Sequence, residues 1–92
     1  MYIVVNHEIS DTTRFWATAQ SATADLPEGV KVIHTLPSPD GRKAVCVWEA
    51  DSVDAVRNFL DPATAGMARN TYFESLNKEG MAMPTLTRAA GA

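Results

Sequence analysis

The sequence has almost no cysteine and no long apolar run. One cysteine among 92 residues excludes an internal disulfide, which fits a reducing compartment. Apolar runs such as residues 3–5 are far too short to span a bilayer, and the opening segment MYIVVNHEIS lacks a basic leader, a long apolar stretch and a cleavage site. We therefore expect a cytoplasmic protein without a membrane partner.

Concentrated positive charge is missing as well. Eight Lys and Arg residues are scattered among eleven Asp and Glu residues, and the net charge of −3 argues against nucleic acid as a partner. The sequence also lacks a glycine-rich phosphate loop, a Cys-x-x-Cys pair, a His-Glu-x-x-His motif and a serine elbow. These absences argue against ATP, dinucleotide and structural zinc functions.

Four segments carry the composition that is typical of β-strands. Each is rich in β-branched or aromatic residues. The predicted strands are residues 2–9, 30–36, 43–49 and 70–76. The second and third are joined by Pro39-Asp40-Gly41, and proline followed by glycine is typical of a tight turn. We therefore expect these two strands to form an antiparallel hairpin.

Two helical patterns separate the strands. Apolar residues recur at helical spacing in residues 12–24, which predicts the first helix. A second apolar stripe begins at Val53, directly after the possible N-caps Asp51 and Ser52. Residues 61–62 are Asp-Pro and could start a further short helical turn, because proline is favoured at a first helical position.

The order strand, helix, strand, strand, helix, strand predicts an α+β domain. Two β-α-β units in tandem, with right-handed crossovers, give the ferredoxin-like βαββαβ fold with a four-stranded antiparallel sheet. The first strand should lie between the third and the fourth, and the second should lie at an edge. We expect this domain to span residues 1–78, and residues 79–92 to form a C-terminal arm or a disordered tail.

Both helices should cover the same face of this sheet and leave the other face open. Side chains alternate along a strand, and a helix-facing surface favours aliphatic residues, so we predict that Val45 and Val47 face the helices. Cys46 and Trp48 would then lie on the open face. The polar residues expected beside them are His34, opposite or next to Cys46, and either His7 or Asn6. An exposed tryptophan there would be costly, so we expect a homodimer whose paired sheets close an α/β barrel.

The stretch from His34 through Glu74 resembles a known group of proteins. The shared pattern is a histidine near the end of the second strand, Cys-x-x-Glu-Ala at residues 46–50, a Ser/Asp-capped helix with Ala-Val, and an aromatic-Glu pair in the fourth strand. His7 matches a histidine late in the first strand. The chain thus resembles the small bacterial ferredoxin-like proteins of the nickel-binding uncharacterised-domain family and, more broadly, the dimeric α/β-barrel superfamily.

The resemblance implies two subunits with their sheets face to face and a metal site near His7 and His34. Superfamily relatives include cofactor-free monooxygenases, polyketide cyclases, lactone isomerases and stress-response proteins. The chain departs from the nickel-binding members in two ways: Asn6 stands where a second histidine of the first strand would be expected, and no histidine follows the second helix.

His7 and His34 are the only histidines, and imidazole can ligate a transition metal or act as a base. The expected topology separates their Cα atoms by roughly 12 Å. This distance is long for two ligands of one metal ion within a chain. Each histidine could instead share an ion with ligands from the other subunit, or it could be structural. Glu74 could orient a histidine or act as a base if it faces inward. The catalytic candidates are therefore His34, His7 and Glu74.

Four further residues are candidates for ligand binding because they could line an apolar pocket with a few polar anchors. They are Trp48, Tyr72, Cys46 and Asn6. The aromatic residues could equally fill a dimer interface. A cysteine among valines is more often a small buried apolar residue than a reactive thiolate.

We therefore expect a small homodimeric ligand- or metal-binding protein with a pocket between the paired sheets, which could hold nickel or another divalent transition metal. The alternative is a cofactor-independent enzyme of the monooxygenase, cyclase or isomerase type that acts on a small or aromatic substrate. A third hypothesis is a structural or regulatory dimer without a pocket. The fold does not choose among them, because one fold hosts many functions.

Overall fold

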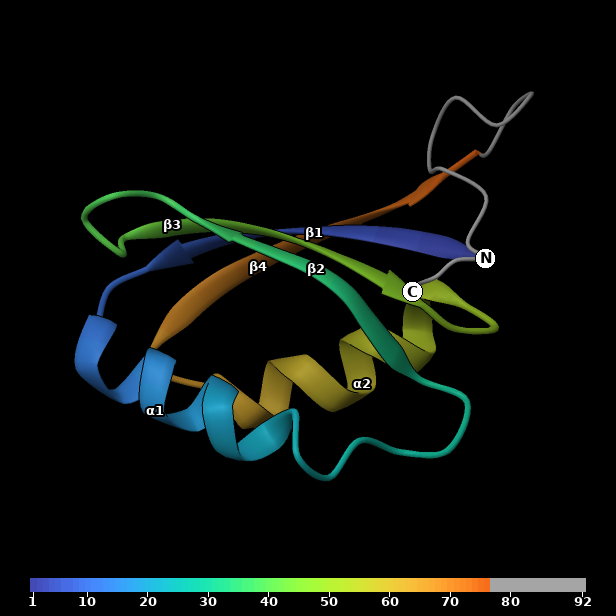
Figure 1. Cartoon of the computed structure of the whole chain (residues 1–92), viewed down its shortest axis with the longest axis horizontal. Helices are drawn as coiled ribbons and strands as arrows, with labels where there is room; N and C mark the ends of the chain where they lie inside the picture. The colour runs from blue at the N-terminus through green and yellow to red at the C-terminus, as the bar shows by residue number, and fades with distance from the viewer. Residues whose placement is uncertain (77–92) are drawn as a thin grey trace, which may run out of the picture.

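The structure is a computed structural model, and it describes residues 1–76. Its elements in chain order are β1 (Tyr2–Ile9), α1 (Thr12–Ala22), β2 (Lys31–Pro37), β3 (Lys43–Glu49), α2 (Val53–Ala63) and β4 (Ala68–Ser75) (Figure 1). This order confirms the α+β prediction. The expected end of the domain at residue 78 and the expected arm at residues 79–92 lie outside the described residues.

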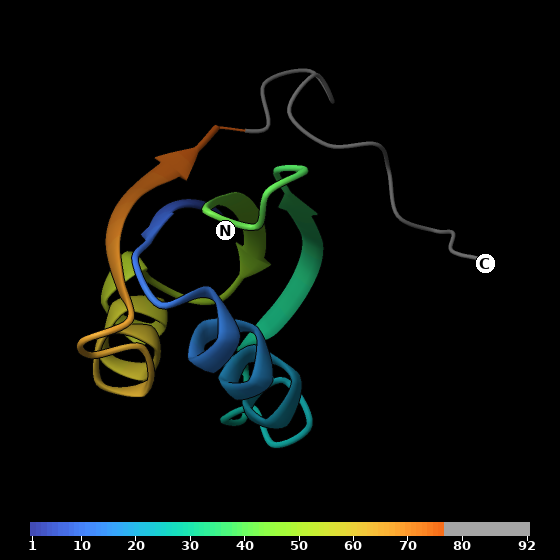
Figure 2. The same cartoon turned by 90° about the vertical axis from the view of Figure 1, so that its left-hand side faces the viewer.

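The four strands form one antiparallel sheet in the order β2-β3-β1-β4, which confirms the predicted topology. Both helices lie against the same face of the curved sheet (Figures 1 and 2). The arrangement is compatible with the ferredoxin-like fold. No helix in residues 1–76 is long and apolar enough to cross a membrane.

Local interactions explain where the helices begin and end. The Asp11 side chain accepts a hydrogen bond from the backbone N–H of Arg14 at 3.1 Å, and Ser52 accepts one from Ala55 at 3.1 Å, so each residue caps a helix. The predicted restart at residue 61 is wrong, because α2 continues through Pro62 to Ala63. A proline so near a helix end removes only a single backbone hydrogen bond.

The β2–β3 hairpin is held to α1 by an indole. The Nε1 group of Trp16 donates a hydrogen bond to the carbonyl oxygen of Gly41 at 3.0 Å. Gly41 has a φ of 74°, and a Cβ atom there would lie 3.2 Å from the same Nε1. The turn therefore needs glycine both for its backbone conformation and for the approach of the tryptophan.

The two faces of β3 are the reverse of our prediction. Cys46 and Trp48 are buried against the helices, with 6% and 3% of their surfaces exposed, whereas Val45 and Val47 face the open side of the sheet. The phase is set by β1, because Trp48 pairs with Ile3, which is completely buried. Helix-facing surfaces favour aliphatic residues only weakly. This preference could not decide which of the two alternating sets of side chains on β3 faces the helices.

The core between the sheet and the helices is divided into two clusters of buried residues. The larger cluster comprises Ile3, Val5, Val30, Cys46, Trp48, Ala50, Val56 and Leu60. The smaller cluster comprises Ile9, Phe15, Ala44 and Met67. His7 lies on β1 between Val5 and Ile9 and is 3% exposed. A polar residue therefore sits where the two apolar clusters meet.

Replacing Trp48 with Ala should lower the free energy of unfolding by about 3–5 kcal/mol, because it removes a large buried ring and leaves a cavity. Chemical denaturation measures this loss. The exposed Ala65→Ser variant serves as a control and should stay within about 0.5 kcal/mol of the wild type. A loss below about 1 kcal/mol for Trp48→Ala would contradict the placement of the ring inside the core.

Candidate functional site

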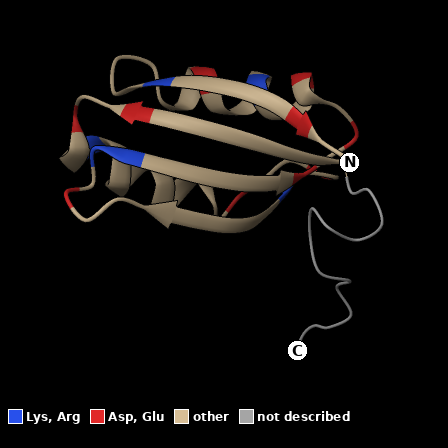
Figure 3. Ribbon diagram, turned by 90° about the horizontal axis from the view of Figure 1, so that it is seen from above, with Lys and Arg blue, Asp and Glu red and all other residues tan. Residues whose placement is uncertain are grey.

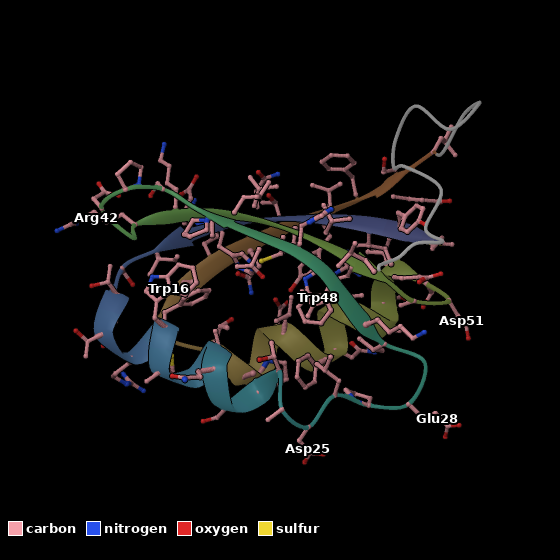
Figure 4. All side chains as sticks on the ribbon, in the orientation of Figure 1. Trp16, Asp25, Glu28, Arg42, Trp48 and Asp51 are labelled. Atoms are coloured by element: carbon pink, nitrogen blue, oxygen red, sulfur yellow. The ribbon has the colours of Figure 1, made fainter. Side chains whose placement is uncertain are left out.

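A pocket lies between the sheet and the two helices, at the junction of the two core clusters. β1, α1, β2, β3 and α2 all contribute to its wall. Its cavity volume is about 40 Å³, and about 460 Å³ when the space at its open side is counted. Figure 4 shows Trp16 and Trp48 in the layer that holds this pocket. The space is therefore a narrow slot.

Apolar atoms form nearly all of the pocket wall. Its aromatic residues are Phe15, Trp16, Trp48 and Phe59. The ring of Phe15 meets the ring of Trp16 edge-on with centroids 4.9 Å apart, and the rings of Trp48 and Phe59 are tilted with centroids 6.1 Å apart. Such a wall suits a small, flat and uncharged molecule, because a charge would lose its hydration without gaining a partner.

One buried polar atom of the lining residue Trp48 is left without a partner. Nε1 of Trp48 is fully buried and has no hydrogen-bond partner among the described residues. A buried donor without an acceptor costs about 1–3 kcal/mol, and native structures contain few of them.

The polar residues of the pocket wall are His7 and four threonines, namely Thr18, Thr23, Thr35 and Thr64. The ring of His7 is held in place by β4. The Nδ1 atom lies 2.6 Å from Oδ1 of Asn70, the residue directly opposite His7 in the β1–β4 pairing. On the other side of Asn70, its Nδ2 group donates to Oγ1 of Thr64 at 2.9 Å and to Oδ1 of Asp61 at 3.2 Å. The ring of Phe15 packs edge-on against the imidazole at 5.2 Å.

Burial sets the charge of His7. Desolvation lowers its pKa from the usual 6.5, and the hydrogen bond to Asn70 opposes this shift but is the smaller effect. The imidazole is therefore neutral at pH 7. A neutral imidazole can accept a hydrogen bond or a proton at the ring nitrogen that carries no hydrogen.

Cys46 lines the same pocket but is a poor nucleophile. Burial raises the pKa of its thiol, and the weak contact of its Sγ atom with Oγ1 of Thr35, at 3.9 Å, is a smaller and opposing effect. The residue therefore stays a thiol at neutral pH and contributes apolar surface.

Tyr72 and Glu74 do not join the pocket wall. Burial, followed by the neighbouring Asp61 carboxylate, raises the pKa of Tyr72, whose hydroxyl donates to Oδ1 of Asp61 at 2.5 Å. The guanidinium of Arg57 lies 5.1 Å from the centre of the tyrosine ring. Glu74 is exposed and pairs with Ile3, four residues along β1 from His7. The structure therefore does not bring Glu74 to a histidine.

Asn6 and His34 lie on the open face, so the two histidines occupy opposite faces of the sheet. His34 is exposed and pairs with Val47, after a register shift in β2 between Val32 and His34. A single metal ion cannot bridge His7 and His34 within one chain. Among residues 1–76, no group of three or more His, Cys, Asp and Glu side chains could hold a metal ion. Nickel binding stays a prediction without structural support.

Asn70, Thr64 and Asp61 are partners of the site that no local sequence signal indicates. The sequence pattern places Asp61 at the start of a helical turn and Asn70 at the start of a strand. Their role depends on the pairing of β1 with β4, which places Asn70 opposite His7 across 63 residues of sequence. With the β1–β4 register known, the pairing of His7 with Asn70 on the apolar, helix-facing side of the sheet would have indicated the site.

Comparisons with known proteins do not assign the chain to a family. No family model matches it. No curated protein matches it either. The site must therefore be interpreted from its own geometry, and the resemblance to nickel-binding proteins stays a prediction.

The stability of the protein should depend on pH through His7. The unfolded chain binds more protons than the folded one below about pH 6.5, so the free energy of unfolding should fall as the pH falls through the unfolded pKa, by at most about 1.4 kcal/mol per pH unit. Chemical denaturation between pH 8 and pH 5 measures this slope. His7→Leu should have a shallower slope than the wild type.

His34→Gln is the matched control for this experiment, because it removes the exposed histidine and leaves His7 in place. It should retain the slope attributed to His7. Identical slopes for the wild type and His7→Leu would contradict a buried, neutral His7.

Proposed function

We propose that the protein binds a small, flat and uncharged molecule in the pocket between its sheet and its helices. The observation that supports this most is a narrow slot between the sheet and the helices whose wall is almost entirely apolar. Ligand pockets usually combine apolar walls with a few placed polar groups. The ligand-binding hypothesis from the sequence is kept, but its pocket lies within one chain instead of between paired sheets.

Water is a poor occupant of this slot. An internal water needs two to four polar partners, and empty apolar cavities stay dry. Nearly all of this wall is apolar. An apolar molecule in the slot would restore the packing contacts that an unfilled space forfeits.

The proposal includes a homodimer formed through the open face of the sheet. One row of that face crosses all four strands and consists of His34, Val47, Val4 and Phe73. Leu36 and Phe73 expose 59% and 52% of their surfaces. Charged residues lie toward the strand ends and leave the middle of the face uncharged (Figure 3). A second copy of the same face would bury this apolar row and close the expected barrel.

A cofactor-independent enzyme is the second candidate, and one specific observation favours it. His7 is a neutral imidazole in a pocket that excludes charge, and its ring is oriented by Asn70. A base of this kind can remove a proton from a bound substrate near neutral pH. In this case the substrate would be small or aromatic.

Ligand binding can be tested by filling the pocket. Ala19→Leu adds bulk to the pocket wall from α1, whereas Ala17→Leu places the same side chain on the exposed side of the same helix. With p-xylene as the probe, the wild type and Ala17→Leu should melt at higher temperature, because the ligand binds the folded state alone. Ala19→Leu should show no such rise. If p-xylene and its phenolic analogue p-cresol both leave the wild-type melt unchanged, the pocket proposal fails.

Dimerisation can be tested with a charge in the centre of the open face. Light scattering of the wild type should give twice the chain mass of 10.0 kDa. Val47→Lys should give the monomer mass, because burying an unpaired ammonium group in the interface is costly. Ala17→Lys on the outer side of α1 should remain dimeric. A wild-type monomer at micromolar concentration would refute the paired sheets and would leave the pocket proposal intact.

A further inference from the structure

The hydrogen bonds around Asn70 fix the orientation of its amide. The carboxylate oxygen of Asp61 can only accept, so the group of Asn70 that faces it at 3.2 Å must be the Nδ2 donor. Nδ2 also donates to Oγ1 of Thr64, whose own hydroxyl hydrogen is directed to the carbonyl oxygen of Leu60 at 2.8 Å. Oδ1 of Asn70 is therefore the atom that faces His7.

The orientation of Asn70 fixes the tautomer of His7 in turn. Oδ1 of Asn70 can only accept, and it lies 2.6 Å from Nδ1 of His7, so Nδ1 carries the hydrogen. In the neutral ring, Nε2 then carries none and presents a lone pair. Within residues 1–76, Nδ1 is the only ring nitrogen of His7 that is hydrogen-bonded.

The lone pair of Nε2 is available to the pocket. The two nitrogens of an imidazole point in widely different directions, and Nδ1 points toward β4, so Nε2 points away from β4. His7 itself lines the pocket, whose other strand residues come from β2 and β3 on that side of β1. The polar anchor at this end of the slot is thus an acceptor without a donor.

The unpaired donor of Trp48 lies far from His7. Trp48 pairs with Ile3, and His7 lies four residues farther along β1. With a rise of ~3.4 Å per residue and a strand spacing of ~4.8 Å, the Cα atoms of His7 and Trp48 are about 14 Å apart. A molecule of the size of a single ring therefore meets one anchor at a time, and the acceptor at His7 can be tested by itself.

We propose that the pocket selects uncharged ligands that carry an O–H or N–H donor, such as a phenol, and that Nε2 of His7 accepts the hydrogen from that donor. This inference rests on the proposed function, because it specifies the ligand class of the same pocket. A ligand of the same shape without the donor would leave Nε2 desolvated and unpaired. The preference for ligands with a donor therefore arises from Nε2 of His7, which is already buried in the protein.

p-Cresol and p-xylene are a matched pair of probes, since a hydroxyl of one replaces a methyl of the other. For each protein, the affinity for p-cresol is divided by the affinity for p-xylene. Comparing this ratio between the wild type and His7→Leu cancels the different hydration of the two probes. Removal of Nε2 should lower the preference for p-cresol by about tenfold. His34→Gln, on the opposite face, should leave the ratio unchanged.

A measurement on the unmodified protein keeps the test independent of the folding of His7→Leu. The nitrogen NMR shifts of the His7 ring should show a hydrogen on Nδ1 and none on Nε2. p-Cresol should shift the Nε2 resonance, whereas p-xylene should not, and the ring of His34 should respond to neither probe.

The outcomes separate this inference from the proposed function. If both probes bind and the affinity ratio is the same in the wild type and His7→Leu, the selection by His7 is overturned and the pocket stands. A hydrogen found on Nε2 would overturn it as well. If neither probe binds, both proposals fall. A lowered ratio in His7→Leu together with a p-cresol shift at Nε2 supports both.

Discussion

The pairing of β1 with both of its neighbours is the constraint on which the rest of the structure depends. β1 is a central strand, and its alternation sends Ile3, Val5, His7 and Ile9 toward the helices. β3 and β4 take their phase from this strand, because antiparallel pairs place partners on the same face, and β2 is aligned in turn by β3. The register therefore decides at once that His7 is buried, that Asn70 can reach it, and that Trp48 enters the core.

The sequence was sufficient for the topology but not for the site. Turn residues such as Gly41 and the change from strand to helix periodicity are local signals, and they predicted the order of the elements and the neighbours of each strand. The face of Trp48 and the partner of His7 depend on registers between strands far apart in the sequence, and a shift of one residue inverts both. Of the residues expected on the open face, His34 lies there and Cys46 and Trp48 do not. The alternative between His7 and Asn6, which the sequence left open, is decided in favour of Asn6.

The polar groups of the pocket weaken the core in which they lie. His7 separates two apolar clusters and needs Asn70 to satisfy its ring, while Nε1 of Trp48 is buried without an acceptor. A leucine and a phenylalanine at these two positions would fill space without leaving such groups. Sites that conflict with an otherwise consistent core are where function is expected, and here both residues line the same slot.

The interior pocket and the open face are physically separate, because the sheet lies between them. The apolar row from His34 to Phe73 is on one side, and the slot with His7 and Trp48 is on the other. Pairing of two sheets would therefore bury the outer row without blocking the slot, whose ligand would be held by one chain. In such a dimer, His34 of each subunit would face the other sheet while His7 faced its own helices, so the two histidines have different surroundings whatever the oligomeric state.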